Sequence, residues 1–551
     1  MKTNRVIKIF LASSEELEAD RYRFGNLIRK LDNIYEKRGI RIELFEWEDY
    51  DAAYNGMRKQ DEYNERVRAS DMFLALFHKK AGKFTIEEFN IARKAFDEQA
   101  SPKIYTYIKD LEAGESESRE LAEFKRLMLE ELGHYWCRYS NFDTMQLHFV
   151  LQLQMVEATT PIKVEVKESQ VKIGDSTIAD LNNVPFTSEN ATHRELQSRK
   201  EQLDREIGNA ESGGRRGFFG QRSRTTDEEL ANLREERESV TEQIERQEKA
   251  LVDTAMSIAR MQGGECSPRM RTAAELFEKG ETDKAEAVLK EDDMEADATN
   301  AKLKFDTAAQ PTAELARNIE RCAGEYMLKA RIVVSGIADE SRYRQAVKLM
   351  STAIDLVSGR LPEETLAEYL FDYAVLLTDA GQQTKALETW ERLSGIYERL
   401  YRKAPQKYAY GYAGVLNNMA VLYSNKGDFD HCLSKYLKAI DIYDRLDREE
   451  PGIYDDDIAR LKNNLGTLYT DRDEYNKALS EFNEAARIRF ELLAKDNDPD
   501  SRSALADIYC NMATALQFSD HPQEALRYIA QAHAILDELD KEFPRIYEYK
   551  L

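Results

Sequence analysis

Residues 71–96 place a carboxylate where many proteins bind ligands. The six apolar residues 72–77 are too few for a helix and read as a buried strand. Lysines and a glycine follow in residues 79–83, and a helix is predicted to begin at Thr85, which puts Glu88 in its first turn. Because ligands bind just beyond the carboxyl ends of the strands in open α/β sheets, Glu88 is the leading candidate for chemistry.

Glu88 has a neighbouring competitor, Glu87. Phe89 and Ala92 form the inward face of the predicted helix, so Glu88 is expected to flank the core at the edge of the strand. This favours Glu88, and Glu87 stays open as the alternative. A purely structural role also stays open, because an acid in the first turn of a helix stabilises the helix dipole without doing chemistry.

Two serines follow the first predicted strand, residues 5–12. Ser13 and Ser14 lie at its carboxyl end, where hydroxyl and backbone N–H groups can receive the phosphates of a ligand. Ser13, with Glu16 three residues later, also matches a capping box that would begin a helix over residues 14–37. A binding role and a capping role are both open for these serines.

The second predicted strand, residues 40–47, ends in an aromatic residue and acids. Trp47 could stack on a base and Asp49 could hydrogen-bond a ribose, as aromatic and polar groups do in small-molecule sites. A place in the core is an even alternative for Trp47, because tryptophan is both apolar and polar.

These candidates belong to strands that alternate with helices. The alternation over about 158 residues predicts a parallel sheet that is covered on both faces. We expect strands over residues 5–12, 40–47, 72–77, 103–108 and 134–140, and helices near 14–37, from Thr85, near 116–132 and near 142–157.

The same motifs resemble a TIR-type domain of the divergent bacterial kind over residues 1–158. The resemblance rests on a strand followed by two serines and a glutamate, on the acidic and aromatic strand end 46–50, and on the FTIEEF motif after the third strand. TIR domains that cleave NAD carry a catalytic glutamate on a helix, often as Trp-x-x-x-Glu. Phe84-x-x-x-Glu88 keeps this spacing with a different aromatic residue. The outline is also similar to nucleoside deoxyribosyltransferases, whose glutamate pattern falls on Glu88 as well.

The resemblance implies a flavodoxin-like sheet and hydrolysis of NAD+, with Glu88 as the catalytic residue. Cleavage of the nicotinamide–ribose bond passes through an oxocarbenium-like state, which a nearby carboxylate stabilises. NAD+ is thus expected as a substrate, with no cofactor. The residues implied to bind it are Ser13, Ser14, Trp47, Asp49 and Phe84.

No metal site and no nucleotide-binding P-loop are expected. His78, His134 and His148 lack the spacing of metal ligands and have no nucleophile partner. The motif GxxxxGK[ST] does not occur in the sequence, so no P-loop ATPase module is expected. The five cysteines are far apart and form no CxxC pair, which fits reduced thiols and gives no zinc site.

Charge and hydropathy limit the class of protein. The formal net charge is −23, which argues against nucleic-acid binding, because contact with phosphates needs a basic surface. No apolar run approaches about 18 residues, so no membrane span is expected. The amino-terminal apolar stretch is too short for a signal peptide, and a cytoplasmic location is expected.

Residues 159–262 connect the first domain to the rest of the chain. Residues 159–190 alternate apolar and polar side chains around Gly174, which predicts a β-hairpin linker. Residues 191–262 carry apolar residues at near-heptad spacing in two runs, which predicts an antiparallel helical hairpin. Its tip, residues 213–224, is basic with two phenylalanines, and it could touch a partner or be disordered.

Residues 263–551 repeat a pattern of small and bulky side chains. From starts at Ala374, Ala420, Gly466 and Ala513, the same size classes recur at offsets 0, 3, 12, 16 and 19, with a period of 46 to 47 residues. The pattern resembles tetratricopeptide (TPR) repeats with long helices, as in the kinesin light chain type, and implies an all-α solenoid that binds protein or peptide. Candidate groove residues, for which packing is the alternative, are Tyr408, Tyr410, Tyr412, Asn417, Asn418, Asn463 and Asn464.

We therefore expect a TIR-like effector tied by a helical hairpin to a TPR sensor. The resemblance implies an NAD+ glycohydrolase in bacterial antiphage or abortive-infection immunity, which acts when the repeats bind a protein or peptide trigger and which forms homo-oligomers on activation. Two alternatives stay open. One is a non-catalytic scaffold for protein interactions, and the other is an enzyme that transfers glycosyl groups on nucleosides or nucleotides.

Overall fold

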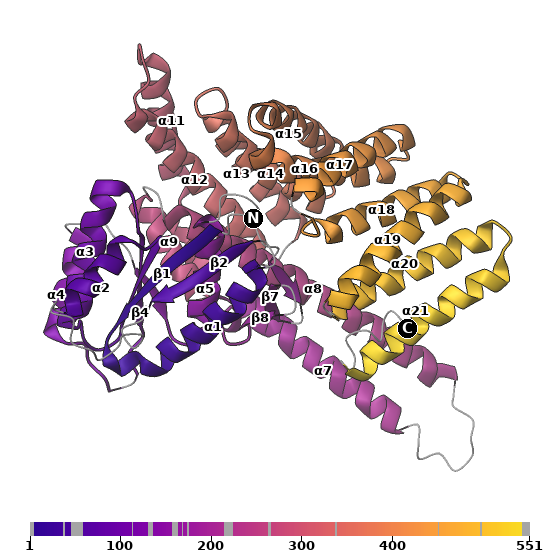
Figure 1. Cartoon of the computed structure of the whole chain (residues 1–551), viewed down its shortest axis with the longest axis horizontal. Helices are drawn as coiled ribbons and strands as arrows, with labels where there is room; N and C mark the ends of the chain where they lie inside the picture. Colours follow the sequence, from indigo (N-terminus) through magenta and orange to yellow (C-terminus); the bar gives the residue numbers. More distant parts are fainter. Residues whose placement is uncertain are drawn as a thin grey trace. The chain divides into compact units, whose positions relative to one another are not determined.

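The computed structural model in Figure 1 forms two compact units, and each is described by itself. The first comprises Met1–Val156, Ile162–Glu295 and Leu328–Arg342, and the second comprises Glu157–Pro161, Ala296–Met327 and Tyr343–Leu551. The finer division into four domains stays a prediction. The structure describes residues 5–36, 39–45, 59–112, 114–130, 136–156, 164–167, 169–173, 176–213, 224–262, 266–336, 339–449, 451–495, 497 and 499–542.

A five-stranded sheet forms the centre of the first unit. Its strands are β1 (Arg5–Ser13), β2 (Ile40–Phe45), β3 (Met72–Phe77), β4 (Lys103–Lys109) and β5 (Trp136–Tyr139). All are parallel and stand in the order β2-β1-β3-β4-β5, which is the doubly wound order of flavodoxin-like folds. Every residue of β3 is buried, as expected for a strand covered on both faces. The predicted parallel sheet is thereby confirmed.

Helices cover both faces of this sheet (Figure 1). They are α1 (Glu18–Glu36), α2 (Lys59–Arg68), α3 (Lys83–Gln99), α4 (Arg119–Glu130) and α5 (Phe142–Val156). On one face, α1 and α5 pack with Ile7, Ile9 and Leu11 of β1. On the other, α2, α3 and α4 pack with Phe10 and Ala12 of the same strand. Because successive side chains of a strand point to opposite faces, β1 contributes to two cores.

A small antiparallel sheet follows, made of β6 (Glu165–Lys167), β7 (Gln170–Ile173) and β8 (Ser176–Asp180). The predicted hairpin corresponds to the β7–β8 pair, and β6 adds a third strand that the sequence reading did not include. Ile173 and Ile178 are fully buried in the core that α1 and α5 form. The small sheet is therefore part of the first unit.

The predicted antiparallel helical hairpin is formed by α7 (Ala191–Gly213) and α8 (Arg224–Gln262). Leu203 and Val240 lie in its small apolar core, at the near-heptad positions that predicted the pairing. Most of the predicted tip, residues 214–223, lies outside the described residues.

Hydrogen bonds among Ser169, His193 and Glu248 connect α8 to α7 and to the small sheet. Oε1 of Glu248, which is fully buried on α8, accepts a hydrogen bond from Ser169 Oγ at 2.6 Å and lies 2.9 Å from His193 Nε2. His193 on α7 is itself 2% exposed, and its backbone N–H donates to Asn190 Oδ1 at 3.0 Å. The side chains of His193 and Glu248 depend on such partners for their hydrogen bonds, because both are almost completely buried.

Every regular element that the structure describes from residue 266 onward is a helix, as predicted. The helices are α9 (Pro268–Glu278), α10 (Thr282–Val288), α11 (Glu291–Thr307), α12 (Ala313–Ser335), α13 (Glu340–Val357), α14 (Glu363–Asp379), α15 (Gln383–Lys403), α16 (Pro405–Asn425), α17 (Phe429–Glu449), α18 (Asp455–Asp471), α19 (Tyr475–Lys495), α20 (Pro499–Phe518) and α21 (Pro522–Glu542). From α14 on, consecutive helices of the second unit pack as antiparallel neighbours and resemble a TPR solenoid (Figure 1). Gly466 shows why small residues recur, since a Cβ there would lie 2.5 Å from the ring of Phe482, the bulky residue at offset 16 of its repeat.

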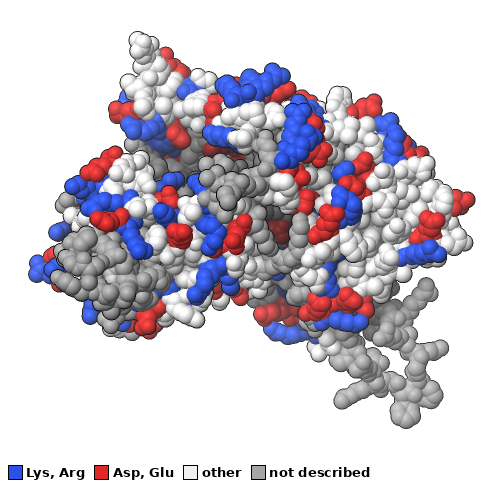
Figure 2. All heavy atoms as spheres, viewed as in Figure 1, with Lys and Arg blue, Asp and Glu red and all other residues white. Residues whose placement is uncertain are grey.

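Among the described residues, no helix is long and apolar enough to cross a membrane. Figure 2 shows basic and acidic side chains interspersed over the visible face. The chain has 79 basic and 102 acidic residues, and on this face the described acids are not gathered in one area.

Candidate functional site

The candidate site lies at the carboxyl ends of β1 and β3, which are neighbours in the sheet. Ser13, the last residue of β1, pairs with Leu76 near the end of β3. The chain leaves β1 toward α1 on one face and leaves β3 toward α3 on the other. In doubly wound sheets, ligands bind at such a point, where the crossovers take opposite faces. Residues 14–17 and 78–82, which follow the two strands, are called the switch-point loops below.

Ser13 is held by a buried arginine and does not cap a helix. Arg21, which is 1% exposed, donates from Nη1 to Ser13 Oγ at 2.9 Å and to the Ser14 carbonyl at 2.8 Å. The predicted capping box is wrong, because β1 continues through Ser13, a 3-10 turn spans Glu15–Leu17, and α1 begins only at Glu18. The serine oxygens are engaged by the guanidinium instead.

Glu16 joins the two switch-point loops. Its Oε1 accepts hydrogen bonds from the backbone N–H groups of Lys79 at 2.9 Å and Lys80 at 3.1 Å. The Ser14 hydroxyl donates to the same oxygen at 3.3 Å. Three donors from two loops therefore converge on one carboxylate oxygen, and successive backbone N–H groups of this kind form anion-binding concavities.

The loop after β3 is also fixed from its other side. Lys79 Nζ forms an ion pair with Glu115, and His78 Nε2 lies 3.4 Å from the same carboxylate. The hydrogen bond from Lys79, followed by one from the N–H of Glu112, holds the pKa of Glu115 below its usual value. The Lys79 carbonyl accepts a hydrogen bond from the Ser118 N–H at 2.7 Å. Acids and backbone groups of the chain itself therefore anchor this loop.

A buried acid, Asp20, lies at the same edge of the sheet beside β4 and β5. Its Oδ2 accepts hydrogen bonds from Lys109 Nζ and from Tyr139 OH, each at 2.9 Å. Asp20 is 5% exposed. Burial, and after it the Asp20 carboxylate, raises the pKa of Tyr139 above its usual value. The three groups connect α1 with the ends of two strands.

Sequence reasoning missed Asp20 and Arg21, although a signal for them exists. Leu17 and Phe24 are buried residues on the inner side of this segment, and positions 20 and 21 fall between them at helical spacing. Charged residues inside an apolar stripe are expected to be buried together with hydrogen-bond partners. The periodicity of the helix would therefore have identified both.

Glu88 lies deeper in its helix than predicted. The predicted start at Thr85 is wrong, because α3 begins at Lys83 after an extended Gly82, so Glu88 is the sixth residue of the helix. Gly82 is the N-cap residue and provides no side-chain hydrogen bond. Glu88 is 7% exposed and precedes Phe89, a core residue. Stabilisation of the helix dipole, which acts within the first turn, does not explain a glutamate at this position.

The remaining predicted site residues differ in how the structure places them. Phe84 is 56% exposed on the first turn of α3. Glu87, the competing carboxylate, accepts a hydrogen bond from Asn64 Nδ2 at 3.2 Å. Trp47 and Asp49 lie outside the described residues. The described part of the chain therefore brings the two serines to the switch point and places both glutamates of the motif on the α3 side of the sheet.

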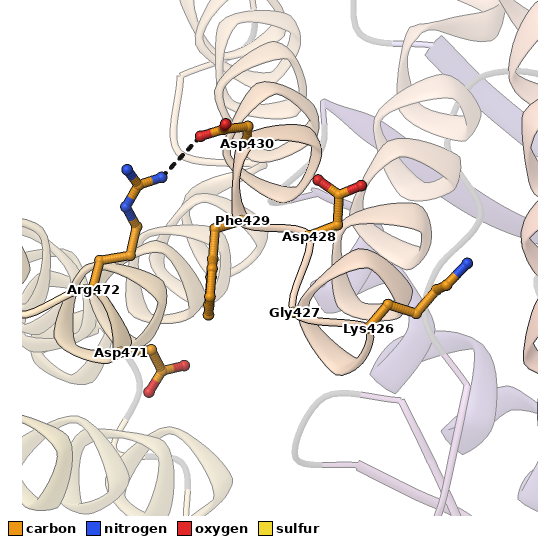
Figure 3. A pocket seen from close by; sticks show the side chains of 7 residues that line it. All are labelled: Lys426, Gly427, Asp428, Phe429, Asp430, Asp471 and Arg472. Carbon is orange, nitrogen blue, oxygen red and sulfur yellow. Dashed lines mark hydrogen bonds and ion pairs between the residues drawn. The ribbon is translucent and has the colours of Figure 1, made fainter.

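The second unit carries an open hollow between two turns of its repeats. One turn joins α16 to α17, the other joins α18 to α19, and the hollow has a volume of about 620 Å³. In Figure 3, Arg472 is directed toward Asp430, and its Nη1 lies 3.0 Å from Oδ1 of that residue. The hollow offers an aromatic ring and charges of both signs. Its lining residues are Lys426, Gly427, Asp428, Phe429, Asp430, Asp471 and Arg472.

The predicted groove residues include at least one packing residue. Tyr412 is 1% exposed, so packing is its role. Asn463 is partly exposed, and its Oδ1 accepts a hydrogen bond from Asn511 Nδ2 at 3.0 Å, which connects α18 to α20. Packing between repeats therefore accounts for part of the predicted set.

Comparison with known proteins yields structural neighbours only. No protein-family model matches the chain, and no curated protein matches it. BtubC (BKLC) from P. vanneervenii is 20% identical over 46% of this chain and 94% of that chain, with a TM-score of 0.34. The apo form of RapI is 16% identical over 62% of this chain and 77% of that chain, with a TM-score of 0.36. A signal transduction ATPase (STAND) protein with a tetratricopeptide repeat sensor from Pyrococcus horikoshii is 12% identical over 98% of this chain and 96% of that chain, with a TM-score of 0.31.

Proposed function

We propose that the chain is an NAD+ glycohydrolase effector of bacterial antiphage or abortive-infection immunity, gated by TPR-like repeats that sense a protein or peptide. The observation that carries the catalytic part is the place of Glu88. It is a glutamate of 7% exposure on the helix that follows the central strand of a doubly wound sheet. Its four-residue spacing from Phe84 supports the resemblance to NAD-cleaving TIR domains.

In the proposed reaction, the Glu88 carboxylate stabilises the oxocarbenium-like state as nicotinamide leaves. Its low exposure supports this role, because a carboxylate acts more strongly on a developing cation where water is excluded. NAD+ enters as the substrate and not as a bound cofactor. The residues proposed to contact it are Ser13 and Ser14 for the phosphates, Trp47 and Asp49 for base and ribose, and the exposed ring of Phe84.

The repeats are proposed to bind the trigger. Stacked helical repeats create extended concave surfaces that bind proteins and peptides. The hollow lined by Phe429 and Arg472 supports contact with a partner that offers apolar and charged side chains. Trigger binding is proposed to bring copies of the chain together and so to activate the effector.

A non-catalytic scaffold is the second candidate, and one observation favours it. Glu16 occupies the N–H groups of Lys79 and Lys80 at the switch point, where a ligand of this fold would bind. Because a side chain of the protein itself occupies these donors, their presence does not require a bound substrate. An enzyme that transfers glycosyl groups on nucleosides would use the same Glu88 carboxylate and differs from the first proposal only in its acceptor.

A time course followed by 1H NMR tests these candidates together. The full chain is incubated at high concentration with NAD+, alone and with a free nucleobase, and in parallel with nucleosides. Release of nicotinamide with formation of ADP-ribose supports the glycohydrolase, and exchange of bases supports the glycosyl transferase. Unchanged spectra in every mixture, including those with candidate triggers, would favour the scaffold.

A further inference from the structure

The Glu16 carboxylate occupies a set of donors that is suited to a larger anion. The Ser14 hydroxyl and the N–H groups of Lys79 and Lys80 all point at its Oε1, at 3.3, 2.9 and 3.1 Å. Two N–H groups of successive residues form a concavity that binds anions of any source, including phosphate. These three donors are called the switch-point cradle below.

The cradle is held in place by groups other than Glu16. Arg21 Nη1 binds the Ser14 carbonyl at 2.8 Å and so fixes the loop after β1. Ser118 donates its N–H to the Lys79 carbonyl at 2.7 Å, and Glu115 pairs with the Lys79 side chain. The donors would therefore keep their positions if the carboxylate swung away, which is the preorganisation that a binding site needs.

Positive charge is available beside the cradle. Lys80 and Lys83 are exposed, and among the described residues no carboxylate lies within ion-pair distance of either. Lys79, in contrast, is paired with Glu115. Exposed lysines at the cradle and three residues after it make the local charge more positive, which favours an anion.

We propose that the switch-point cradle is a binding site for a phosphate group of a nucleotide ligand, and that Glu16 fills it until the ligand displaces the carboxylate. The identification of the ligand as NAD+ rests on the proposed function. The phosphate site itself rests on the donors and on their place between the crossovers of the sheet.

Because the Glu16 carboxylate competes for the same donors, phosphate binds more weakly than it would to an empty cradle. A ligand binds only the fraction of molecules in which the carboxylate has left, so its apparent dissociation constant is the intrinsic constant divided by that fraction. With an open fraction of about one sixth or less, removal of the carboxylate tightens phosphate binding by about 6-fold or more.

The test measures binding of inorganic pyrophosphate to the full chain by calorimetry at constant ionic strength. We expect Glu16→Ala to bind pyrophosphate about 6-fold or more tightly than the wild type. Glu18→Ala, which removes an exposed acid from the start of α1, is the matched control and should bind as the wild type does. In the Glu16→Ala background, Ser14→Ala should lose part of the gain, because it removes one of the three donors.

Equal affinities in wild type, Glu16→Ala and Glu18→Ala would overturn the proposal. An equal gain in both variants would also overturn it, because only net charge would then matter. Glu16→Gln keeps a neutral oxygen on the same donors and provides a folded comparison if Glu16→Ala does not fold. It should bind pyrophosphate several-fold more tightly than the wild type, and no gain would count against the site.

The pyrophosphate-binding test and the nicotinamide-release test can fail independently of each other. Pyrophosphate binding is read without any turnover, so a chain that never releases nicotinamide can still have the phosphate site. Conversely, the protein could release nicotinamide while Glu16→Ala shows no gain in pyrophosphate affinity. That result would support the proposed enzyme and refute the phosphate site at the cradle.

Discussion

Replacement of Glu88 by glutamine probes the catalytic proposal directly. Glu88→Gln keeps the size and helix propensity of the side chain and removes its charge. The loss of one contact to a developing charge in the transition state costs about 3–4 kcal/mol, so nicotinamide release should slow by about two to three orders of magnitude.

The position of Glu88 in α3 determines what the same variant does to stability. An exposed acid in the first turn would contribute only about 0.3–1 kcal/mol. Glu88 is instead 7% exposed and in the second turn. A buried polar group whose hydrogen bonding is disturbed typically destabilises the folded state by about 1–3 kcal/mol, which most domains tolerate. We therefore expect a lower melting temperature together with a folded, nearly inactive protein.

The assay pairs nicotinamide release with a melting curve for wild type, Glu88→Gln and Glu87→Gln. Glu87→Gln is the matched control, because glutamine can still accept the hydrogen bond from Asn64 Nδ2. It should keep nearly full activity. Full activity in Glu88→Gln with loss in Glu87→Gln would show that the neighbouring carboxylate acts, and full activity in both would refute any role for this helix in the chemistry.

Two predictions concern stability, and both are measured as the free energy of unfolding in urea. His193→Ala should destabilise the first unit by about 3–5 kcal/mol, because it leaves the carboxylate of Glu248 buried beside an unfilled space; a decrease in the free energy of unfolding of less than about 1 kcal/mol would mean that water takes the place of the imidazole. The second change, Gly466→Ala, should destabilise the repeats by about 1–3 kcal/mol, because the new Cβ would lie 2.5 Å from Phe482. Gly414→Ala is its control, since nothing lies within 4 Å of a Cβ there, and it should stabilise α16 by about 0.5–1 kcal/mol; equal effects of the two changes would contradict the packing argument.

Features that residues close together in the sequence determine, such as the strand 72–77 and the helical repeats, were predicted correctly. The strand 72–77 has the predicted bounds. Polar residues flank a short apolar run and so limit the length of the segment that can be buried. The repeats from Ala374 onward are helical, because helix pairs that pack closely need small residues at fixed offsets. The parallel direction of the strands follows from the same alternation of strand and helix.

Hydrogen bonds between distant segments were not predictable in the same way. Glu16 and Lys79 are 63 residues apart, so the sequence suggested a local partner, Ser13, for a carboxylate that binds another loop. The predicted start of the helix at Thr85 likewise differs from the structure, where α3 begins two residues earlier at Lys83. The Glu16 error arises because local rules assign a polar side chain to its nearest backbone group.

The size of the Glu16 interaction decides whether a ligand can displace the carboxylate from the switch-point cradle. Two hydrogen bonds to backbone N–H groups, each with a net value of about 0.5–1.5 kcal/mol, would favour the filled cradle by about 1–3 kcal/mol. The corresponding open fraction lies between about one sixth and one part in 160. An interaction of tens of kcal/mol could not be displaced by a phosphate ligand, and one far below 1 kcal/mol would leave the cradle open in a large fraction of molecules. A few kcal/mol is the range of ordinary coupling between two binding sites, so a phosphate ligand and a change in loop position could each shift this equilibrium.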